Sequence, residues 1–355
     1  MKKIILVSGI VLLVLIVVAG VTMWYFMQQP LYQPGMVRAM QNLTPPAQTG
    51  EADFWAVEPD IKLYHFSQGA GRNVLIIHGG PGYPFQQPLA GLKPLTDRYK
   101  FHYYDQRGCG QSTRPIDKFT SSNYYENMST LDRTLGLGAQ IADIERIRQI
   151  LGDDQLILIG HSFGGFLAAL YAAEFPEHVA ALILVAPADT LVMPPSTGGL
   201  FDEVKQLLPT DMQAEYDIFL KNYLDYGSIF SKSEADLVAL NGEFAKYYMA
   251  VLKAKGVTLP DEQESIQNGG GWMVHAMYFS MGLRHDYRPA LKDVTAPTLV
   301  LHGDQDLQPV AVEQMYVSAL PSARLEVIQN AGHFSFDEQP EAFATALEGF
   351  LTEVK

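Results

Sequence analysis

The chain has 355 residues, 48% of them hydrophobic, and a formal net charge of −14. This charge, without a cluster of Lys and Arg, argues against a nucleic-acid partner, because phosphate contacts need a basic patch. The single cysteine, Cys109, excludes an intrachain disulfide. The nine histidines form no metal-site spacing, so we expect neither a metal nor a cofactor.

The beginning of the chain is uncharged and mostly apolar from Ile4 to about Met27. Some 23 helical residues span roughly 34 Å, enough for a bilayer core of about 30 Å. A signal peptide usually has a shorter apolar core and an A-x-A-like exit, which residues 18–20 imitate poorly. We therefore expect residues 1–27 to be an uncleaved transmembrane anchor, with cleavage as the alternative.

The basic residues around this segment predict its orientation. Lys2 and Lys3 precede it, and the next basic residue is Arg38. By the positive-inside rule the N-terminus lies in the cytosol and the body on the periplasmic or extracellular side. Residues 28–50, with four prolines, predict a polar linker between anchor and body.

From residue 51 onward, strand-like runs alternate with helical ones. Runs at 54–57 and 61–66 predict an opening antiparallel pair. Six more runs follow, at 73–77, 101–104, 155–159, 181–185, 298–301 and 325–328. Four of these six are almost continuously apolar, as expected of strands covered on both faces of a parallel sheet. The pattern predicts an α/β fold with a mostly parallel eight-stranded sheet.

One helix in this alternation shows a clear periodicity before the third of the six runs. Ile141, Ile144, Ile147 and Leu151 form an apolar stripe that charged residues mostly flank, and Gly152 is a plausible C-cap.

Between residues 188 and 294 the alternation stops. This part is rich in Tyr, Phe, Met and Leu at helical spacing and has no buried-strand run. It predicts a helical cap over the carboxyl edge of the sheet, where open α/β sheets bind ligands. The core then consists of residues 51–187 and 295–355. We expect the aromatic residues of the cap to be mainly its own core: Tyr216, Phe219, Tyr223, Phe244, Tyr247 and Tyr248.

The sequence Gly-His-Ser-Phe-Gly at 160–164 follows one of the apolar strands and precedes an apolar helix. A G-x-S-x-G between a strand and a helix is typical of the nucleophile elbow of α/β-hydrolases. Ser162 is therefore the predicted nucleophile. The alternative is an ordinary strand-turn-helix with an incidental serine.

An activated serine needs a base, and the base needs an acid that orients it. In this fold the acid and then the histidine follow late strands. His333 follows the last strand, and its alternative is a hydrogen-bonded surface histidine. Asp306 follows the strand before it and is the predicted acid, with Asp304 as the alternative.

The oxyanion hole of such an enzyme needs two backbone N–H groups aimed at one point. Phe163 follows the nucleophile and supplies one. The Gly-rich loop at 78–82 supplies the other, and Gly80 is the predicted donor.

Three segments carry a family resemblance: His-Gly-Gly-Pro-Gly at 78–82, Asp-Gln-Arg-Gly-Cys-Gly-Gln-Ser at 105–112 and Gly-His-Ser-Phe-Gly-Gly at 160–165. Together they resemble the proline iminopeptidase family of α/β-hydrolases, over about residues 61–187 and 296–355. The resemblance implies Ser162, Asp306 and His333 as a triad and Gly80 and Phe163 as oxyanion donors. We interpret Asp105 and Arg107 as a structural turn and Cys109 as a buried packing residue.

The cap differs from that family, whose members hold the free amine of the substrate with cap glutamates, one of them in a W-x-x-W-E segment. That segment is missing here. Glu243, Glu264 and Trp272 are the candidate substrate-binding residues, with a solvated surface position as the alternative for both glutamates.

The leading hypothesis is a serine hydrolase of the proline iminopeptidase type that releases N-terminal Pro or small residues from short peptides. The first alternative is a carboxylesterase or lactonase acting on small apolar esters. The second is a non-catalytic binding protein with this fold, which usually lacks a triad residue. The expected partners are a small-molecule or short-peptide substrate and, through residues 1–27, a membrane.

Overall fold

A central eight-stranded sheet organises the computed structural model of the protein, which describes residues 28–195, 198–257 and 267–354 and positions 15, 17, 18, 20–22 and 25. The strand order is β1-β2-β4-β3-β5-β6-β9-β10. Only β1/β2 and β2/β4 are antiparallel, so the predicted mostly parallel sheet is confirmed. The strands are β1 (Phe54–Glu58), β2 (Ile61–Gly69), β3 (Arg72–Ile77), β4 (Tyr99–Tyr104), β5 (Leu156–His161), β6 (Val179–Val185), β9 (Thr298–Gly303) and β10 (Ala323–Ile328).

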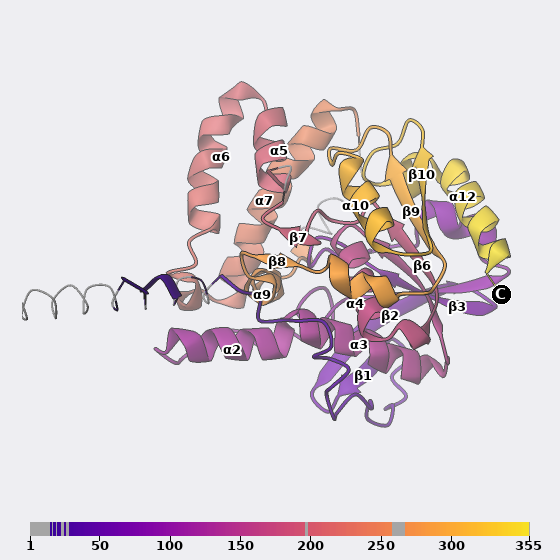
Figure 1. The fold of residues 1–355 in the computed structure, drawn as a ribbon, viewed down its shortest axis with the longest axis horizontal. Helices are drawn as coiled ribbons and strands as arrows, with labels where there is room; N and C mark the ends of the chain where they lie inside the picture. Colours follow the sequence, from indigo (N-terminus) through magenta and orange to yellow (C-terminus); the bar gives the residue numbers. More distant parts are fainter. Residues whose placement is uncertain are drawn as a thin grey trace, which may run out of the picture.

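Helices cover both faces of this sheet (Figure 1). Because side chains alternate along a strand, Leu158 of β5 packs into one core and its neighbours Ile157 and Ile159 into another. The first core, called the main core below, includes α3 (Leu137–Leu151), α4 (Phe163–Glu174) and α10 (Ala311–Ala319). The second core includes η1 (Ala90–Leu95), α11 (Ser335–Glu338) and α12 (Pro340–Glu353). A short 3-10 turn, η2 (Pro176–His178), leads from α4 into β6.

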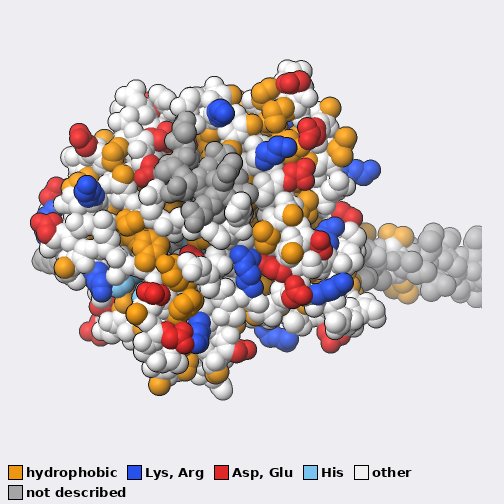
Figure 2. All heavy atoms as spheres, turned by 180° about the vertical axis from the view of Figure 1, so that it is seen from behind, with side chains coloured by type: hydrophobic (Ala, Val, Ile, Leu, Met, Phe, Trp, Pro, Cys, Tyr) orange, Lys and Arg blue, Asp and Glu red, His pale blue; other side chains and the backbone are white. Residues whose placement is uncertain are grey.

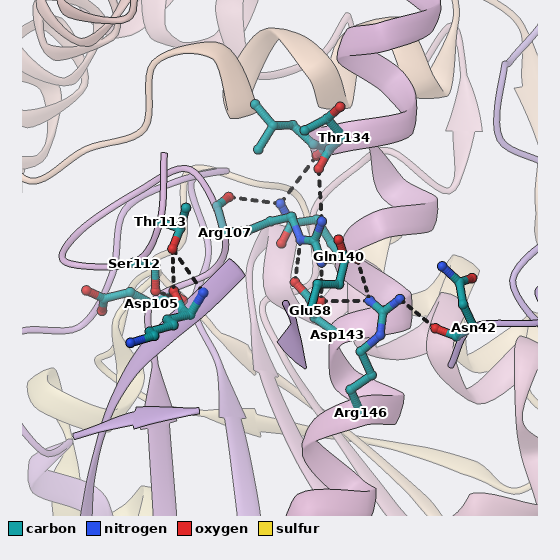
Figure 3. Close-up of polar contacts among 12 residues, drawn as sticks. Asn42, Glu58, Asp105, Arg107, Ser112, Thr113, Thr134, Gln140, Asp143 and Arg146 are labelled. Carbon is teal, nitrogen blue, oxygen red and sulfur yellow. Dashed lines mark hydrogen bonds and ion pairs between the residues drawn. The ribbon is translucent and has the colours of Figure 1, made fainter. Parts of the chain in front are cut away.

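Helix α3 ends where the sequence predicts, because Gly152 adopts a left-handed conformation with φ 75° and ψ 21°. The charged residues of α3 are expected to flank its apolar stripe, but two of them do not lie at its exposed sides. Asp143 and Arg146 are buried together with the apolar stripe, because Arg107 and Glu58 complete an ion network around them (Figure 3).

The segment predicted as the cap contributes to two separate cores. Its first helices, α5 (Leu200–Leu207), α6 (Thr210–Tyr223) and α7 (Glu234–Ala254), stand out from the body and share a cluster of their own (Figure 1). That cluster contains four of the six predicted cap-core aromatics: Tyr216, Phe219, Tyr223 and Tyr247. Helix α9 (Trp272–Met281), in contrast, joins the main core beside α2 (Tyr124–Leu135) and α3. The short elements between these helices and β9 are β7 (Val192–Met193), η3 (Ile229–Ser231), β8 (His285–Asp286) and η4 (Arg288–Asp293).

Residues 28–48, called the strap below, lie against the body rather than forming the predicted polar linker. Tyr32 and Val37 are buried in the main core. The buried carboxylate of Glu174 accepts hydrogen bonds from the Tyr32 hydroxyl and the Gly35 N–H, both at 2.8 Å, and from the Arg38 N–H at 3.0 Å. Two buried side chains and the hydrogen bonds to Glu174 thus hold the strap against the body, although its prolines predicted a free spacer.

Within the described part of the chain, no helix is long and apolar enough to cross a membrane. Most of the predicted anchor, residues 1–27, lies outside the described residues. The described positions between 15 and 25 include five apolar side chains that are more than half exposed: Leu15, Val17, Val18, Val21 and Tyr25. Figures 1 and 2 show these described positions beyond one side of the body.

Candidate active site

Ser162 lies at the turn between β5 and α4 with φ 54° and ψ −121°. A positive φ is strained for any residue with a side chain and is typical of the nucleophile elbow. Two hydrogen bonds hold the turn, from the Ser162 N–H to the Val185 carbonyl and from the Gly165 N–H to the Ser162 carbonyl, both 2.9 Å long.

Glycines make room for this turn. A Cβ on Gly164 would lie 2.1 Å from the Ile77 carbonyl oxygen, and a Cβ on Gly79 would lie 2.8 Å from the Cβ of Ser162. Such separations are sterically forbidden unless the backbone moves. The glycines of the motif and of the 78–82 loop therefore allow strand β3 and the elbow to pack closely.

His333 and Asp306 meet as the chain order predicts. His333 follows β10, Asp306 follows β9, and the His333 Nδ1 lies 2.9 Å from the Asp306 Oδ2. Asp304 is exposed and instead accepts a long hydrogen bond from the Ala331 N–H. Asp306 is thus the carboxylate in contact with the imidazole.

Ser162 and His333 line one cavity together with Asp306. Both residues are described, and no direct hydrogen bond joins the Ser162 hydroxyl to the His333 imidazole. In enzymes without a bound substrate, catalytic hydrogen bonds are often long and shorten when the substrate binds.

The electrostatics of the histidine and the aspartate are coupled. Burial alone would lower the pKa of His333, but the charge and hydrogen bond of Asp306 raise it above its ordinary value. Burial alone would raise the pKa of Asp306, but His333 and the Gln308 N–H lower it. The site therefore stabilises an imidazolium facing a carboxylate, the charge state a serine hydrolase needs after the serine loses its proton.

A second layer of polar residues behind Asp306 did not emerge from the sequence. The fully buried Glu313 lies 3.2 Å from His302 and accepts a hydrogen bond from the Gln308 side chain at 2.9 Å. The Gln308 N–H in turn donates to Asp306 at 3.0 Å. His302, Asp306 and Glu313 are the one group in the described part of the chain with metal-ligand spacing, but hydrogen bonds already engage both oxygens of Asp306 and one oxygen of Glu313.

The two predicted oxyanion donors lie at the same cavity. Gly80 and Phe163 both line it, and the N–H of neither makes a hydrogen bond within the described chain. His78 fixes the Gly80 loop, because its Nδ1 contacts the Gly79 carbonyl at 3.0 Å and its Nε2 accepts from the Gln106 N–H at 3.1 Å. Burial lowers the pKa of His78 to about 4, so the His78 side chain is neutral.

The turn that carries Gln106 is braced on both sides, as predicted for Asp105 and Arg107. The backbone carbonyl of Asp105 accepts a hydrogen bond from the Ser112 hydroxyl at 2.6 Å, and its carboxylate accepts one from the Gln111 N–H at 2.8 Å. Arg107 is fully buried and binds Asp143 at 2.6 Å and Glu58 at 2.8 Å (Figure 3). Cys109 in the same turn is buried, as expected of a packing residue.

The cavity has a volume of about 1090 Å³ and mostly aromatic and aliphatic walls. Three acidic residues outside the candidate triad also line it: Asp189, after β6, Glu203, on α5, and Asp337, on α11. Burial, together with the charges of Asp189 and Asp306, raises the pKa of Glu203 to about 7. Sequence analysis missed Glu203; its only signal is a position three residues after Leu200, another lining residue on the same helix face.

Two of the three predicted substrate-binding residues, Glu243 and Trp272, lie away from this cavity. Glu243 is exposed on α7 and does not line it. Trp272 is fully buried in the main core, and its indole N–H donates to the Asp117 carbonyl at 3.1 Å. The third candidate, Glu264, lies outside the described residues. Phe244 and Tyr248 pack against the cap core, as expected, and also line the cavity.

Comparisons with known proteins agree with this geometry. The family model described as alpha/beta hydrolase fold matches residues 72–340. A proline iminopeptidase of Saccharolobus solfataricus is 27% identical over 303 residues, covering 82% of this chain and 88% of that protein. This similarity confirms the resemblance stated from the motifs.

Solved structures share the fold. The proline iminopeptidase of Mycobacterium smegmatis superimposes with a TM-score of 0.58 at 19% identity, covering 83% of this chain and 96% of that one. An esterase from Thermogutta terrifontis has a TM-score of 0.54 at 22% identity, covering 85% and 97%. With the elbow, the sheet order and the family match on one chain, this protein belongs to the α/β-hydrolase family and is a hydrolase related to proline iminopeptidases.

Proposed function

We propose that this hydrolase acts through an acyl-enzyme on Ser162. The Ser162 Oγ attacks the substrate carbonyl carbon while His333 accepts the hydroxyl proton. The N–H groups of Gly80 and Phe163 bind the oxyanion that forms. The bond to the leaving group then breaks, and His333 returns the proton to the leaving nitrogen or oxygen.

Water completes the cycle by the same route. His333 accepts a proton from a water molecule as its oxygen attacks the acyl carbon. The bond to Ser162 breaks, and the proton passes to the Ser162 oxygen, which restores the enzyme and releases the acid. Asp306 holds the imidazole orientation throughout and balances its positive charge.

The finer proposal is an aminopeptidase that recognises a free α-amine through Glu203. The supporting observation is a carboxylate from the cap in the cavity that holds Ser162, near enough to Asp306 and His333 for their charges to alter its pKa. A free α-amine is protonated below about pH 8, so above pH 7 it meets an ionised Glu203. The relative from S. solfataricus is named a proline iminopeptidase.

Two glutamates of the cap allow a matched test. Glu203→Gln should lower kcat/KM for proline-β-naphthylamide by about 10–100-fold, the usual effect of losing a charged hydrogen bond. Glu243→Gln, at the exposed position, should leave it unchanged. Equal effects of the two variants, or none from Glu203→Gln, would reject Glu203 as the amine site.

Esterase activity is the second candidate, and the large apolar cavity favours it. Hydrolysis of p-nitrophenyl acetate and butyrate without any cleavage of proline-β-naphthylamide would favour esterase activity and reject the aminopeptidase proposal. In either case, Ser162→Ala should lower turnover by about 10⁴-fold or more. A folded protein whose Ser162 resists a fluorophosphonate probe would favour the non-catalytic alternative.

We also propose that residues 1–27 anchor the protein in a membrane, with the N-terminus in the cytosol and the body on the periplasmic or extracellular side. The supporting observations are the uncharged sequence from Ile4 to Met27, the two lysines before it and the exposed apolar side chains between positions 15 and 25.

A further inference from the structure

The cavity is larger and more apolar than an N-terminal proline requires. Its volume of about 1090 Å³ lies just above the range of about 300–1,000 Å³ for pockets that hold a drug-sized ligand. Of its acidic lining residues, Glu203 lies close enough to Asp306 and His333 for their charges to act on it. Apolar side chains from other elements extend the lining: Leu31, Tyr125, Met128, Leu224, Met281 and Leu283.

Three of these apolar residues are also widely exposed, so they form the rim of the cavity. Tyr125 on α2 is 52% exposed, Leu224 after α6 is 43% exposed and Leu283 after α9 is 61% exposed. Exposed apolar side chains are common singly on a protein surface, but a group of them around a cavity mouth indicates an apolar ligand or surface.

The strap connects this rim to the N-terminal segment. The carbonyl of Gln28 accepts hydrogen bonds from the N–H groups of Leu283 and Arg284, both at 3.0 Å. Gln29 and Leu31, the next residues of the strap, themselves line the cavity. The chain therefore leaves the body at the rim, on the side where α2 and the end of α6 also lie (Figure 1).

An anchor that starts at the rim brings the rim to the bilayer surface. We propose that the substrate is an amphipathic acyl compound drawn from the lipid surface, whose long apolar chain occupies the part of the cavity between the rim and Ser162. This inference rests on the proposed acyl-enzyme chemistry and on the proposed anchor. The reacting carbonyl would lie at Ser162, and the chain would lie along Met128 and Met281 toward Leu283.

Chain-length dependence tests the substrate class. The full chain, reconstituted in phosphatidylcholine vesicles, would be assayed with p-nitrophenyl esters of 2 to 12 carbons and with prolyl amides of alkylamines of the same lengths. We expect kcat/KM to rise at least about tenfold from the short to the long members of one series, because each added methylene is removed from water. A flat or falling profile in both series, with active short substrates, would overturn this inference and leave the hydrolase proposal intact.

Two leucines at the ends of cap helices provide a matched pair. Leu224 lines the cavity, whereas Leu207, with a similar exposed fraction of 41%, does not. Leu224→Asp should reduce the ratio of long-chain to short-chain kcat/KM at least about fivefold, and Leu207→Asp should leave the ratio unchanged. Equal ratios in the two variants would contradict a chain-binding role for the rim.

The orientation of the rim can be tested without turnover. Cys109 is buried, so a cysteine introduced by Leu283→Cys can be labelled with a fluorophore. We expect spin-labelled lipids to quench this fluorophore in vesicles, and to spare one attached after Val327→Cys on β10. Equal quenching at the two positions would overturn the proposal even if the protein hydrolyses short substrates.

Discussion

Ser162 depends on neighbours that have no side chain. Gly79 is the most instructive, because an added Cβ would meet the Ser162 Cβ at 2.8 Å and the His161 carbonyl oxygen at 2.9 Å. The added methyl group would thus displace the nucleophile and the loop that carries Gly80. A displacement of a few tenths of an ångström there changes the attack geometry more than it changes the fold.

We therefore expect Gly79→Ala to lower kcat about 10–100-fold while the protein remains folded, measured with p-nitrophenyl acetate and by thermal unfolding. Gly349 on α12 provides the control, since an added Cβ there meets nothing within 4 Å. Gly349→Ala should keep full activity and stabilise the helix slightly. Unchanged kcat in Gly79→Ala would contradict the steric argument.

The ionisation of His333 sets the dependence of activity on pH. A protonated imidazole accepts no proton from Ser162, so activity is lost as the pH falls through the pKa of His333. Because Asp306 raises this pKa above its ordinary value, we expect the midpoint of the acid limb of kcat/KM for an ester above pH 6.5. Asp306→Asn should move the midpoint to lower pH and reduce kcat on the order of 10⁴-fold. A midpoint below pH 6.5 in the unaltered protein would contradict the assignment.

At the scale of elements, α3 is held by charges as well as by its apolar stripe. Asp143 is fully buried between Arg107 and Arg146, and Glu58 of β1 completes the network (Figure 3). Removing one charge of such a network leaves the opposite charges buried and unpaired, which costs far more than the network contributes when intact.

Asp143→Asn should therefore lower the free energy of unfolding by about 3–5 kcal/mol, measured by denaturant titration. Glu353→Gln breaks an exposed pair with Arg324 and should change it little. Similar losses in the two variants would show that burial does not determine the effect.

The elements that the sequence predicted are those with a local signal. Central strands such as β5 and β9 are recognisable because both of their faces are buried, and the motif around Ser162 is recognisable because its glycines are sterically required. Glu203 has only its spacing from Leu200 as a local signal, since its role depends on how α5 packs over the sheet. The strap has no local signal, because the carboxylate that binds it, Glu174, lies more than 130 residues away in the chain. Similarly, Trp272 could be assigned to the core only once the position of α9 was known.

For the whole molecule, the proposed anchor predicts a simple partition. The full chain should sediment with phosphatidylcholine vesicles through its uncharged segment from Ile4 to Met27. A chain starting at Gln28 keeps the strap and the cavity rim and should remain in the supernatant with its short-ester activity intact. Vesicle binding by both chains to the same extent would contradict the anchor.

The hydrogen bonds between Glu174 and the strap have a mechanical consequence. A flexible linker between an anchor and the body would let the body rotate freely, so that any side of the body could face the lipid. Here the Tyr32 hydroxyl and the N–H groups of Gly35 and Arg38 fasten the chain only a few residues after the segment leaves the body. With the anchor proposed above, so short a connection would leave the protein little rotational freedom and would keep one side of the body toward the bilayer.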